Sequence, residues 1–286
     1  MRVLVTGAGG QLGHDTVLAC TAAGDEVIAC DHASLDITHR DQVLAAITST
    51  APDVVVNCAA WTAVDACEDD PDRALAANGL SVRWVAEACA RIGAHLVHIS
   101  TDYVFDGTLD RPYHEWDEPN PESVYGITKL IGEREASVLG TSAAIVRTSW
   151  VCSEHGANMV KTVMRLAEQH PVLSFVSDQV GHPTFTGDLA PVLRQVALDR
   201  RSGVMHLTNQ TPTNWYGFAA NVVELMGKDP AMVQPITTAQ LQPPRPAPRP
   251  ANSVLDNAVA RMGGLSLMRD HRLPMGELVR KLLIAG

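Results

Sequence analysis

The sequence predicts an α/β protein: a Rossmann-type doubly wound parallel sheet followed by a smaller, mixed C-terminal substrate lobe. Short apolar runs alternate with helical patterns over residues 1–150, as they do in βαβ units. A glycine-rich stretch separates the first apolar run from the first helical pattern, and the alternation loosens after Trp150. We therefore expect a dinucleotide-binding domain at 1–150 and a substrate-binding lobe at 151–286, with part of the second half returning to the first domain.

Length and composition are typical of a two-lobed enzyme. The 286 residues are 46% hydrophobic, which is enough for a sizeable core, and their formal net charge is −10. That charge argues against a general nucleic-acid-binding protein, which normally carries a basic footprint. No apolar stretch reaches the roughly 18 residues of a membrane span, and we expect neither a signal peptide nor a membrane anchor. The six cysteines lie singly, which favours reduced thiols in a cytoplasmic protein.

The first apolar run, Arg2–Thr6, leads directly into a glycine motif. Gly7, Gly10 and Gly13 are spaced three residues apart, and a helical pattern follows at 15–20. In a nucleotide-binding turn such glycines allow a tight bend, a bare backbone beside a pyrophosphate and close helix packing. The helix N-terminus then presents N–H groups to the phosphates. The motif predicts a dinucleotide site, and an ordinary glycine-rich turn is the alternative.

The second strand, Glu26–Cys30, ends at an acidic residue. Asp31 is placed to bind the ribose hydroxyls of NAD and would repel a 2′-phosphate, whereas Arg40 would instead favour NADP. The sequence leaves the choice between NADH and NADPH open. Asp36 lies in a predicted turn before the helix expected at 39–50, where it either caps that helix or contacts the adenine end of the cofactor.

The third strand, Pro52–Asn57, is rich in valine, as a central parallel strand should be. Ala59 and Ala60 follow it, and their small side chains would let a cofactor approach. Residues 61–70 are predicted to form a loop, and a long helix is predicted from Pro71 to about Arg91.

Polar side chains follow the fourth strand, Ala94–Ile99, at its carboxyl end. These are Ser100, Thr101 and Asp102. Ligands of open parallel sheets bind at this edge. The hydroxyls are placed to bond a substrate carbonyl oxygen and Asp102 to help proton exchange, although capping of the next segment would also explain them.

Tyr125 and Lys129 are four residues apart, so on a helix they share one face. A phenol and an ammonium held together form a proton-transfer pair. Lowering the phenol pKa from about 10 to about 7 needs roughly 4 kcal/mol. A cation about 6 Å away at an effective dielectric constant of about 20 supplies roughly 2.8 kcal/mol. The spacing thus predicts that Lys129 lowers the pKa of Tyr125.

The remaining pattern is simpler. Asn214 is predicted to cap a helix whose apolar stripe includes Trp215 and belongs to the core. The proline-rich segment 242–250 is predicted to be an extended surface loop. Further strands are expected at 143–147, 172–176 and 203–207, and further helices at 158–170, 187–200 and 274–284.

The motifs together resemble the extended short-chain dehydrogenases/reductases and, within them, the dTDP-4-dehydrorhamnose reductases. The resemblance spans essentially the whole chain with its motifs in order. The matching stretches are Gly7–Gly13, Asn57–Asp65, Ser100–Gly107, Tyr125–Lys129 with Gly132 and Glu133, and Arg147–Trp150. It implies dTDP-rhamnose biosynthesis: NADPH- or NADH-dependent reduction of the C4 keto group of a dTDP-linked 4-keto-6-deoxyhexose.

The resemblance also implies the role of each site residue. Thr101 holds the carbonyl oxygen, Tyr125 donates a proton, Asp102 assists and Lys129 binds the nicotinamide ribose. The residues expected to bind the cofactor are Gly7, Gly10, Gln11, Leu12, Gly13, Asp31, Asp36, Ile37, Ala59, Ala60, Tyr125 and Lys129. Those expected to bind the sugar nucleotide are Thr101, Asp102, Tyr103, Tyr125, Trp150 and Arg249, the last because a guanidinium matches a diphosphate.

Several alternatives stay open at this point. One is a reductase of another nucleotide-linked keto sugar, and others are an epimerase, a dehydratase or a non-catalytic NAD(P)-binding regulatory subunit. Some relatives are associated with Mg²⁺ and dimerise, but no acidic metal cluster is evident, so we expect no catalytic metal and leave a homodimer open. Trp61 and Cys152 depart from the family pattern and are expected to line the sugar pocket.

Overall fold

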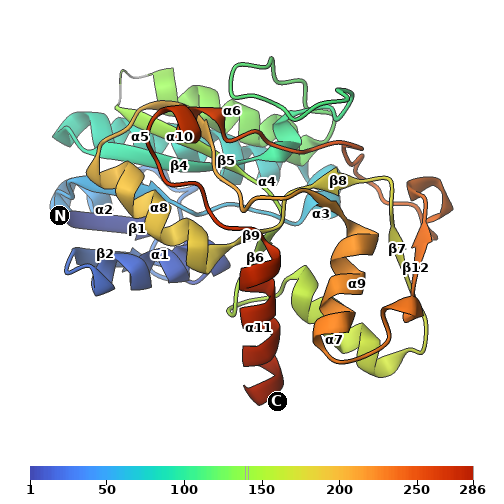
Figure 1. Cartoon of the computed structure of the whole chain (residues 1–286). Coiled ribbons are helices and arrows are strands. Elements are labelled where there is room, and N and C mark those ends of the chain that lie inside the picture. The colour runs from blue at the N-terminus through green and yellow to red at the C-terminus, as the bar shows by residue number, and fades with distance from the viewer. Residues whose placement is uncertain (139, 141, 286) are drawn as a thin grey trace.

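The centre of the protein is a six-stranded sheet. The computed structural model describes residues 1–138, 140 and 142–285. All neighbouring strands of the sheet are parallel, in the order β2-β1-β3-β4-β5-β10 (Figure 1). The strands are β1 (Arg2–Thr6), β2 (Glu26–Cys30), β3 (Val54–Asn57), β4 (His95–Thr101), β5 (Ala143–Thr148) and β10 (Gly203–His206). The strand order reverses between β1 and β3, where sheets of this kind bind ligands.

Helices cover both faces of the sheet, so the predicted doubly wound fold is confirmed. One face packs against α1 (Gln11–Ala22) and α8 (Thr186–Leu198), the other against α2 (Arg40–Thr50), α5 (Ser81–Ile92) and α6 (Val124–Val138). Successive side chains of a strand point to opposite faces. Accordingly Val3 and Val5 join the first core and Leu4 joins the second, each fully buried.

A separate core holds the smaller lobe together. It is built on α7 (Met159–Gln169), α9 (Trp215–Leu225) and α11 (Arg272–Ala285), with Phe218 and Met275 buried at its centre. Figure 1 shows α7 and α9 beside the strand pair β7–β12, away from the large sheet. The short strands are β6 (Val151–Cys152), β7 (Leu173–Val176), β8 (Val180–Gly181), β9 (Thr184–Phe185), β11 (Thr213–Asn214) and β12 (Val233–Ile236), paired as β6–β9, β7–β12 and β8–β11.

The prediction from the sequence is partly wrong for the segment that follows β3. The loop predicted at 61–70 is wrong in part, because α3 (Val64–Asp69) forms there. The predicted helix at 71–91 is present but is interrupted. It comprises α4 (Pro71–Ala74), a π-helical turn (Leu75–Leu80) and α5. The other short helices are α10 (Ala258–Met262) and 3₁₀ turns at Asp102–Val104, Pro230–Met232 and Thr238–Gln240.

Two elements from the second half of the chain, one strand and one helix, are part of the sheet lobe. Strand β10 pairs with β5, and α8 packs beside α1. We keep the division at residue 150 as a proposal, with α8 and β10 assigned to the first lobe.

The prediction for the start of α9 is confirmed, since Asn214 Oδ1 accepts a hydrogen bond of 2.7 Å from the Gly217 amide.

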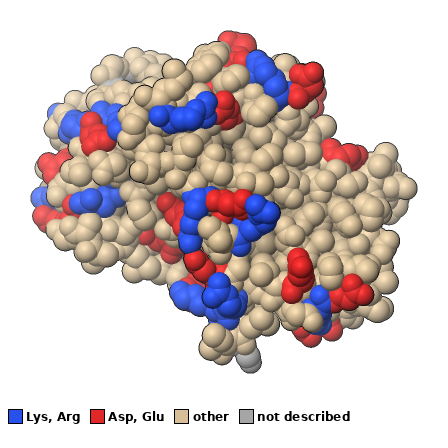
Figure 2. All heavy atoms as spheres, in the orientation of Figure 1, with Lys and Arg blue, Asp and Glu red and all other residues tan. Residues whose placement is uncertain are grey.

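The surface carries charges of both signs. Figure 2 shows acidic and basic side chains interspersed on the face seen in Figure 1, without a continuous basic stripe across it. Among the described residues, no helix combines the length and the apolar character that crossing a bilayer requires. All six cysteines are free thiols.

A buried ion pair joins α6 to the sheet. Glu133 on α6 accepts bonds from Arg147 on β5 at 2.9 and 2.7 Å, and from the Ser100 hydroxyl on β4 at 2.5 Å. The side chains of Glu133 and Arg147 are only 5% and 3% exposed. Removing one partner of such a pair leaves a buried charge uncompensated, which costs about 3–5 kcal/mol.

We therefore expect Glu133→Gln to lower the free energy of unfolding by about 3 kcal/mol or more, because Arg147 would stay charged without its partner. Urea denaturation followed by circular dichroism measures this loss. The matched control is Arg91→Gln, which breaks an exposed pair with Glu87 and should cost less than about 1 kcal/mol. Equal losses in the two variants would contradict the assigned role of Glu133.

Candidate active site

Two neighbouring cavities open along the carboxyl ends of the central strands. The first, of about 900 Å³, lies over the glycine motif and is called the glycine-loop cavity. The second, of about 400 Å³, lies beside Tyr125 and is called the Tyr125 cavity. Gly10, Cys58 and Ala60 line both. The two cavities therefore form one continuous trench at the edge of the sheet where its strand order reverses.

The glycine motif brings bare backbone to the trench. Gly7 has a φ of +66°, and a Cβ atom there would lie 2.7 Å from the amide nitrogen of Ala59. A Cβ atom on Gly13 would lie 2.1 Å from the Gly7 carbonyl oxygen. Only glycine fits at both positions, and α1 begins directly after Gly10 without a side-chain cap. The open N–H groups at this helix end fit a pyrophosphate.

All of the predicted cofactor residues line this trench. In the glycine-loop cavity Asp31 lies at the end of β2, and hydrogen bonds from Ser34 hold the pKa of its carboxyl below the usual value. Asp36 accepts a bond from the Thr38 amide rather than capping α2, which begins after His39. The predicted cofactor residues that line one or both cavities are Gly7, Gly10, Gln11, Leu12, Gly13, Asp31, Asp36, Ile37, Ala59, Ala60, Tyr125 and Lys129.

Arg40 is turned away from the trench. Its guanidinium bonds to Glu87 at 2.6 and 3.1 Å and stacks over the Trp84 ring. It does not line the glycine-loop cavity, so the suggestion that it favours NADP is not supported. Arg73 lines the cavity instead, with its guanidinium 4.3 Å from the centroid of the Trp61 ring. Nothing in the sequence distinguishes Arg73 from a surface arginine, so its place in this cavity could not be predicted.

Trp61 and Cys152 do not line the sugar side of the trench, contrary to expectation. Trp61 lines the glycine-loop cavity. Cys152 is 2% exposed and borders a different cavity, between α1 and α11.

The Tyr125 cavity collects the predicted catalytic side chains. Thr101 and Asp102 come from the end of β4, and Tyr125 and Lys129 from the first two turns of α6. The Thr101 hydroxyl donates a 3.0 Å hydrogen bond to Asp102. The Tyr103 ring meets the Tyr125 ring edge-on at 5.6 Å. The structure thus brings together hydroxyls, a carboxyl and an ammonium that lie far apart in the sequence.

Burial is the largest cause of the pKa shifts of Tyr125, Lys129 and Asp102. It raises the pKa of Tyr125, against a hydrogen bond with Thr101 that lowers it. The pKa of Tyr125 is therefore raised by burial and not lowered as predicted. The Lys129 ammonium donates a 2.6 Å hydrogen bond to the Ile99 carbonyl oxygen. Burial also lowers the pKa of Lys129 to about 8, which Glu133 opposes, and raises the pKa of Asp102 to about 6.

Two tryptophans form one wall of the Tyr125 cavity. The rings of Trp150 and Trp215 stack with their centroids 3.6 Å apart and their planes tilted by 8°. Trp150 lies at the expected place, with a φ of +45°. Trp215 packs against the core of the smaller lobe, as the apolar stripe of α9 predicts, and it also lines the cavity, which was not predicted. The helical periodicity could not reveal this, because Trp215 is the first residue of α9, where the stripe meets the lobe boundary.

Arg249 is the one predicted site residue outside the trench. It is paired with Asp65 on α3, through its Nη1 atom and through Nη2 at 2.9 Å, and hydrogen bonding to Arg249 lowers the pKa of Asp65. Burial raises the pKa of the Tyr103 hydroxyl, and the charge of Arg249 opposes this shift. The pair ties the proline-rich segment to α3. Binding of a diphosphate by Arg249 stays a prediction.

Among the described residues, neither cavity has three or more metal-ligating side chains close enough together to hold one ion. The expectation that catalysis uses no metal is not tested by this and stays a prediction. One such group lies elsewhere, at His14, Asp15 and His155, and is considered below.

Comparisons with known proteins agree with this geometry. The chain is 42% identical over 282 residues to the dTDP-4-dehydrorhamnose reductase of Streptomyces griseus, covering 96% of this chain and 92% of the relative. The crystal structure of a dTDP-4-dehydrorhamnose reductase from Clostridium acetobutylicum is 41% identical, with a TM-score of 0.95 and coverage of 99% and 100%. That of Bacillus anthracis, in complex with NADP, is 33% identical, with a TM-score of 0.92 and coverage of 100% and 99%.

A family model described as the RmlD substrate binding domain matches residues 1–284. The chain therefore belongs to the family of the RmlD substrate binding domain, together with the dTDP-4-dehydrorhamnose reductases that it resembles in sequence and structure.

Proposed function

We propose that this protein is an NAD(P)H-dependent reductase of the C4 keto group of a dTDP-linked 4-keto-6-deoxyhexose, most simply converting dTDP-4-dehydro-L-rhamnose to dTDP-L-rhamnose. The observation that carries the proposal is the convergence of Thr101, Tyr125 and Lys129 in a cavity continuous with the glycine motif. The relatives named above support the substrate class.

Different residues of the trench bind different parts of the cofactor. The glycine motif and the start of α1 receive the pyrophosphate, and Asp31 receives the adenosine ribose. Lys129 lines the Tyr125 cavity and binds the nicotinamide ribose. When bound, the reduced nicotinamide supplies a hydride to C4 of the sugar. The acidic Asp31 favours NADH, and a related protein binds NADP, so both forms belong in the assay.

Tyr125 and Thr101 act on the sugar carbonyl. Their hydroxyls hold the C4 oxygen, which develops negative charge as the C4–H bond forms. Tyr125 then gives its proton to that oxygen, so the product is an alcohol. Because burial raises the pKa of Tyr125, the phenol is protonated at working pH and ready to donate. Asp102 bonds to Thr101 and offers a route for returning a proton to Tyr125.

The stacked indoles of Trp150 and Trp215 provide a flat apolar wall in the same cavity as these polar groups. A 6-deoxyhexose carries an apolar methyl-bearing edge that such a wall can cover. The intact set of Thr101, Tyr125 and Lys129 argues against a non-catalytic regulatory subunit.

The experiment that tests this function follows consumption of NADH and of NADPH in parallel, with enzymatically prepared dTDP-4-dehydro-L-rhamnose. Formation of dTDP-L-rhamnose supports the proposal and ranks the two cofactors. Cofactor binding without consumption would overturn the proposed substrate and favour another nucleotide-linked keto sugar, or a regulatory role.

Replacing Tyr125 by Phe removes the proton donor and leaves the ring in place. We expect turnover to fall by about 10² or more, with little change in cofactor affinity measured by fluorescence titration. Tyr113→Phe is the matched control, since Tyr113 is buried outside the trench and should keep near-normal turnover. Near-normal turnover of Tyr125→Phe would exclude Tyr125 as the donor.

The lowered pKa of Lys129 makes cofactor binding depend on pH. Lys129 is charged below pH 8 and becomes neutral above about pH 8. Its charge favours the anionic cofactor, so the dissociation constant should stay flat near pH 7 and increase above about pH 8, by at most tenfold per pH unit. Fluorescence titration from pH 6.5 to 9.5 measures this. Lys129→Gln should bind more weakly near pH 7 and lose the dependence; an unchanged pH profile would argue against Lys129 as its source.

A further inference from the structure

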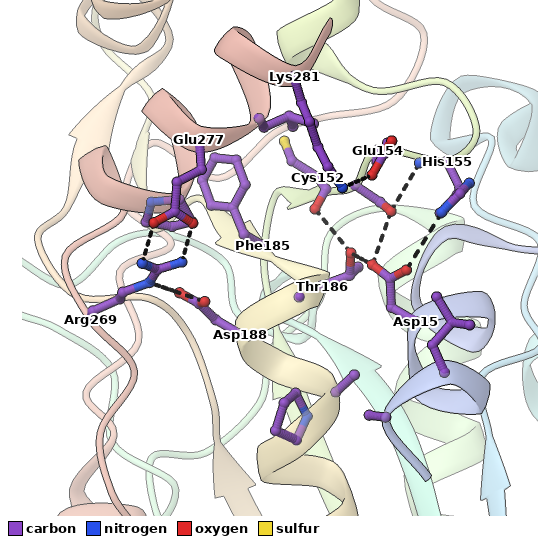
Figure 3. A pocket seen from close by; sticks show the side chains of 18 of the residues that line it. Asp15, Cys152, Glu154, His155, Phe185, Thr186, Asp188, Arg269, Glu277 and Lys281 are labelled. Carbon is purple, nitrogen blue, oxygen red and sulfur yellow. Dashed lines mark hydrogen bonds and ion pairs between the residues drawn. The ribbon is translucent and has the colours of Figure 1, made fainter. Parts of the chain in front are cut away.

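A third cavity, of about 560 Å³, lies between α1, α8 and α11 and shares no lining residue with the trench. Asp15 and His155 face each other at its rim, and Thr186 bonds to the same carboxyl (Figure 3). His14, next to Asp15 on α1, completes the group. We propose that His14, Asp15 and His155 form a binding site for one divalent transition-metal ion of the zinc, cobalt or nickel class.

The three ligand atoms lie at distances that a single ion can bridge. The Asp15 Oδ1 atom is 3.3 Å from His14 Nδ1 and 4.0 Å from His155 Nε2. Each residue offers one ligand atom, and all three atoms lie within 4.8 Å of one another. Ligands held about 2.0–2.1 Å from a tetrahedral zinc ion are separated by roughly 3.3 Å. One of the three pairs, His14 with Asp15, already has this spacing. The two pairs that include His155 need a small rotation of its partly exposed ring.

The carboxyl of Asp15 is held in place for this task. Its Oδ2 atom accepts hydrogen bonds from the Ser153 hydroxyl at 3.1 Å and from the Thr186 hydroxyl. These bonds leave Oδ1 directed toward the two imidazoles. Hydrogen bonds to the second oxygen of a carboxylate ligand fix its orientation and strengthen metal binding.

The two imidazole rings lie against each other, which hydrogen bonding alone does not require. Their centroids are 3.7 Å apart and their planes are tilted by 41°. Two imidazole nitrogens and one carboxylate oxygen suit zinc, cobalt or nickel, whereas Mg²⁺ prefers oxygen ligands. Three protein ligands leave a further position for water. The nearby Glu154 is paired with Lys281, so it is not counted as a ligand.

Such an ion would join the two lobes. His14 and Asp15 belong to α1 of the sheet lobe, and His155 lies in the segment that leads into α7 of the smaller lobe. A weaker link already exists there, since Asn158 donates a 3.0 Å hydrogen bond to Gln11 at the start of α1. A bound ion would add a firmer connection directly after the residues of α1 that line the trench. We infer a structural ion that fixes the lobes, with no part in the chemistry.

The test uses the full chain with any affinity tag removed and bound metal stripped by a chelator. Isothermal titration with ZnCl₂ measures stoichiometry and affinity, and the visible absorption of bound Co²⁺ reports nitrogen ligation. We expect one ion per chain, a higher melting temperature with zinc, and no displacement of Co²⁺ by excess Mg²⁺. His14→Gln and His155→Gln should each weaken binding by roughly tenfold or more.

The variants are chosen to keep the fold intact. The side chains of His14 and His155 are 38% and 41% exposed, so their replacement disturbs no core, and melting without metal checks this. His170→Gln, an exposed histidine at the end of α7, is the matched control and should bind zinc as the unaltered chain does. Absence of a one-to-one complex, or equal binding by all three variants, would overturn the proposal. These readouts are independent of turnover.

Discussion

The active site depends on the buried ion pair between Glu133 and Arg147. Tyr125, Lys129 and Glu133 follow one another at four-residue spacing along one face of α6. Glu133 is bound by Ser100 on β4 and Arg147 on β5, so it anchors that face to β4, whose end carries Thr101, and to the neighbouring strand β5. Its charge also opposes the loss of the Lys129 proton. One side chain therefore holds the helix face that carries Tyr125 and Lys129 and, against the larger effect of burial, favours the charged form of Lys129.

The sheet brings this helix to the cofactor. Strands β1 and β3 end where the strand order reverses, and the glycine motif follows β1 there. Strand β4 lies next to β3 and carries Thr101 at the same edge. Since all these strands are parallel, motifs almost 120 residues apart in sequence, Gly7 and Tyr125, line adjoining cavities. The smaller lobe completes the site from outside the sheet, by placing Trp215 against Trp150.

Most of the sheet lobe could be predicted from local patterns. The strands at Arg2–Thr6 and Glu26–Cys30 begin and end where the apolar runs do. For the first of these the reason is burial on both faces, because β1 is a central parallel strand, whereas β2 lies at the edge of the sheet and is only partly buried. The short helix α3 was missed, since six residues give too little periodicity for recognition. Trp215, Arg73 and the pairing of Arg249 with Asp65 depend on contacts between distant segments. No local pattern encodes such contacts.

The error over Tyr125 has a physical cause that applies beyond this residue. Coulomb attraction to Lys129 was weighed alone, at roughly 2.8 kcal/mol. Burying a phenolate removes its hydration, and that penalty acts in the opposite direction. In the folded protein burial is the larger effect, and Lys129 bonds to the Ile99 carbonyl. For a reductase this balance is favourable, because a proton donor must hold its proton until the substrate oxygen becomes negative. A lowered pKa would suit the reverse reaction, in which the tyrosinate must accept a proton from an alcohol.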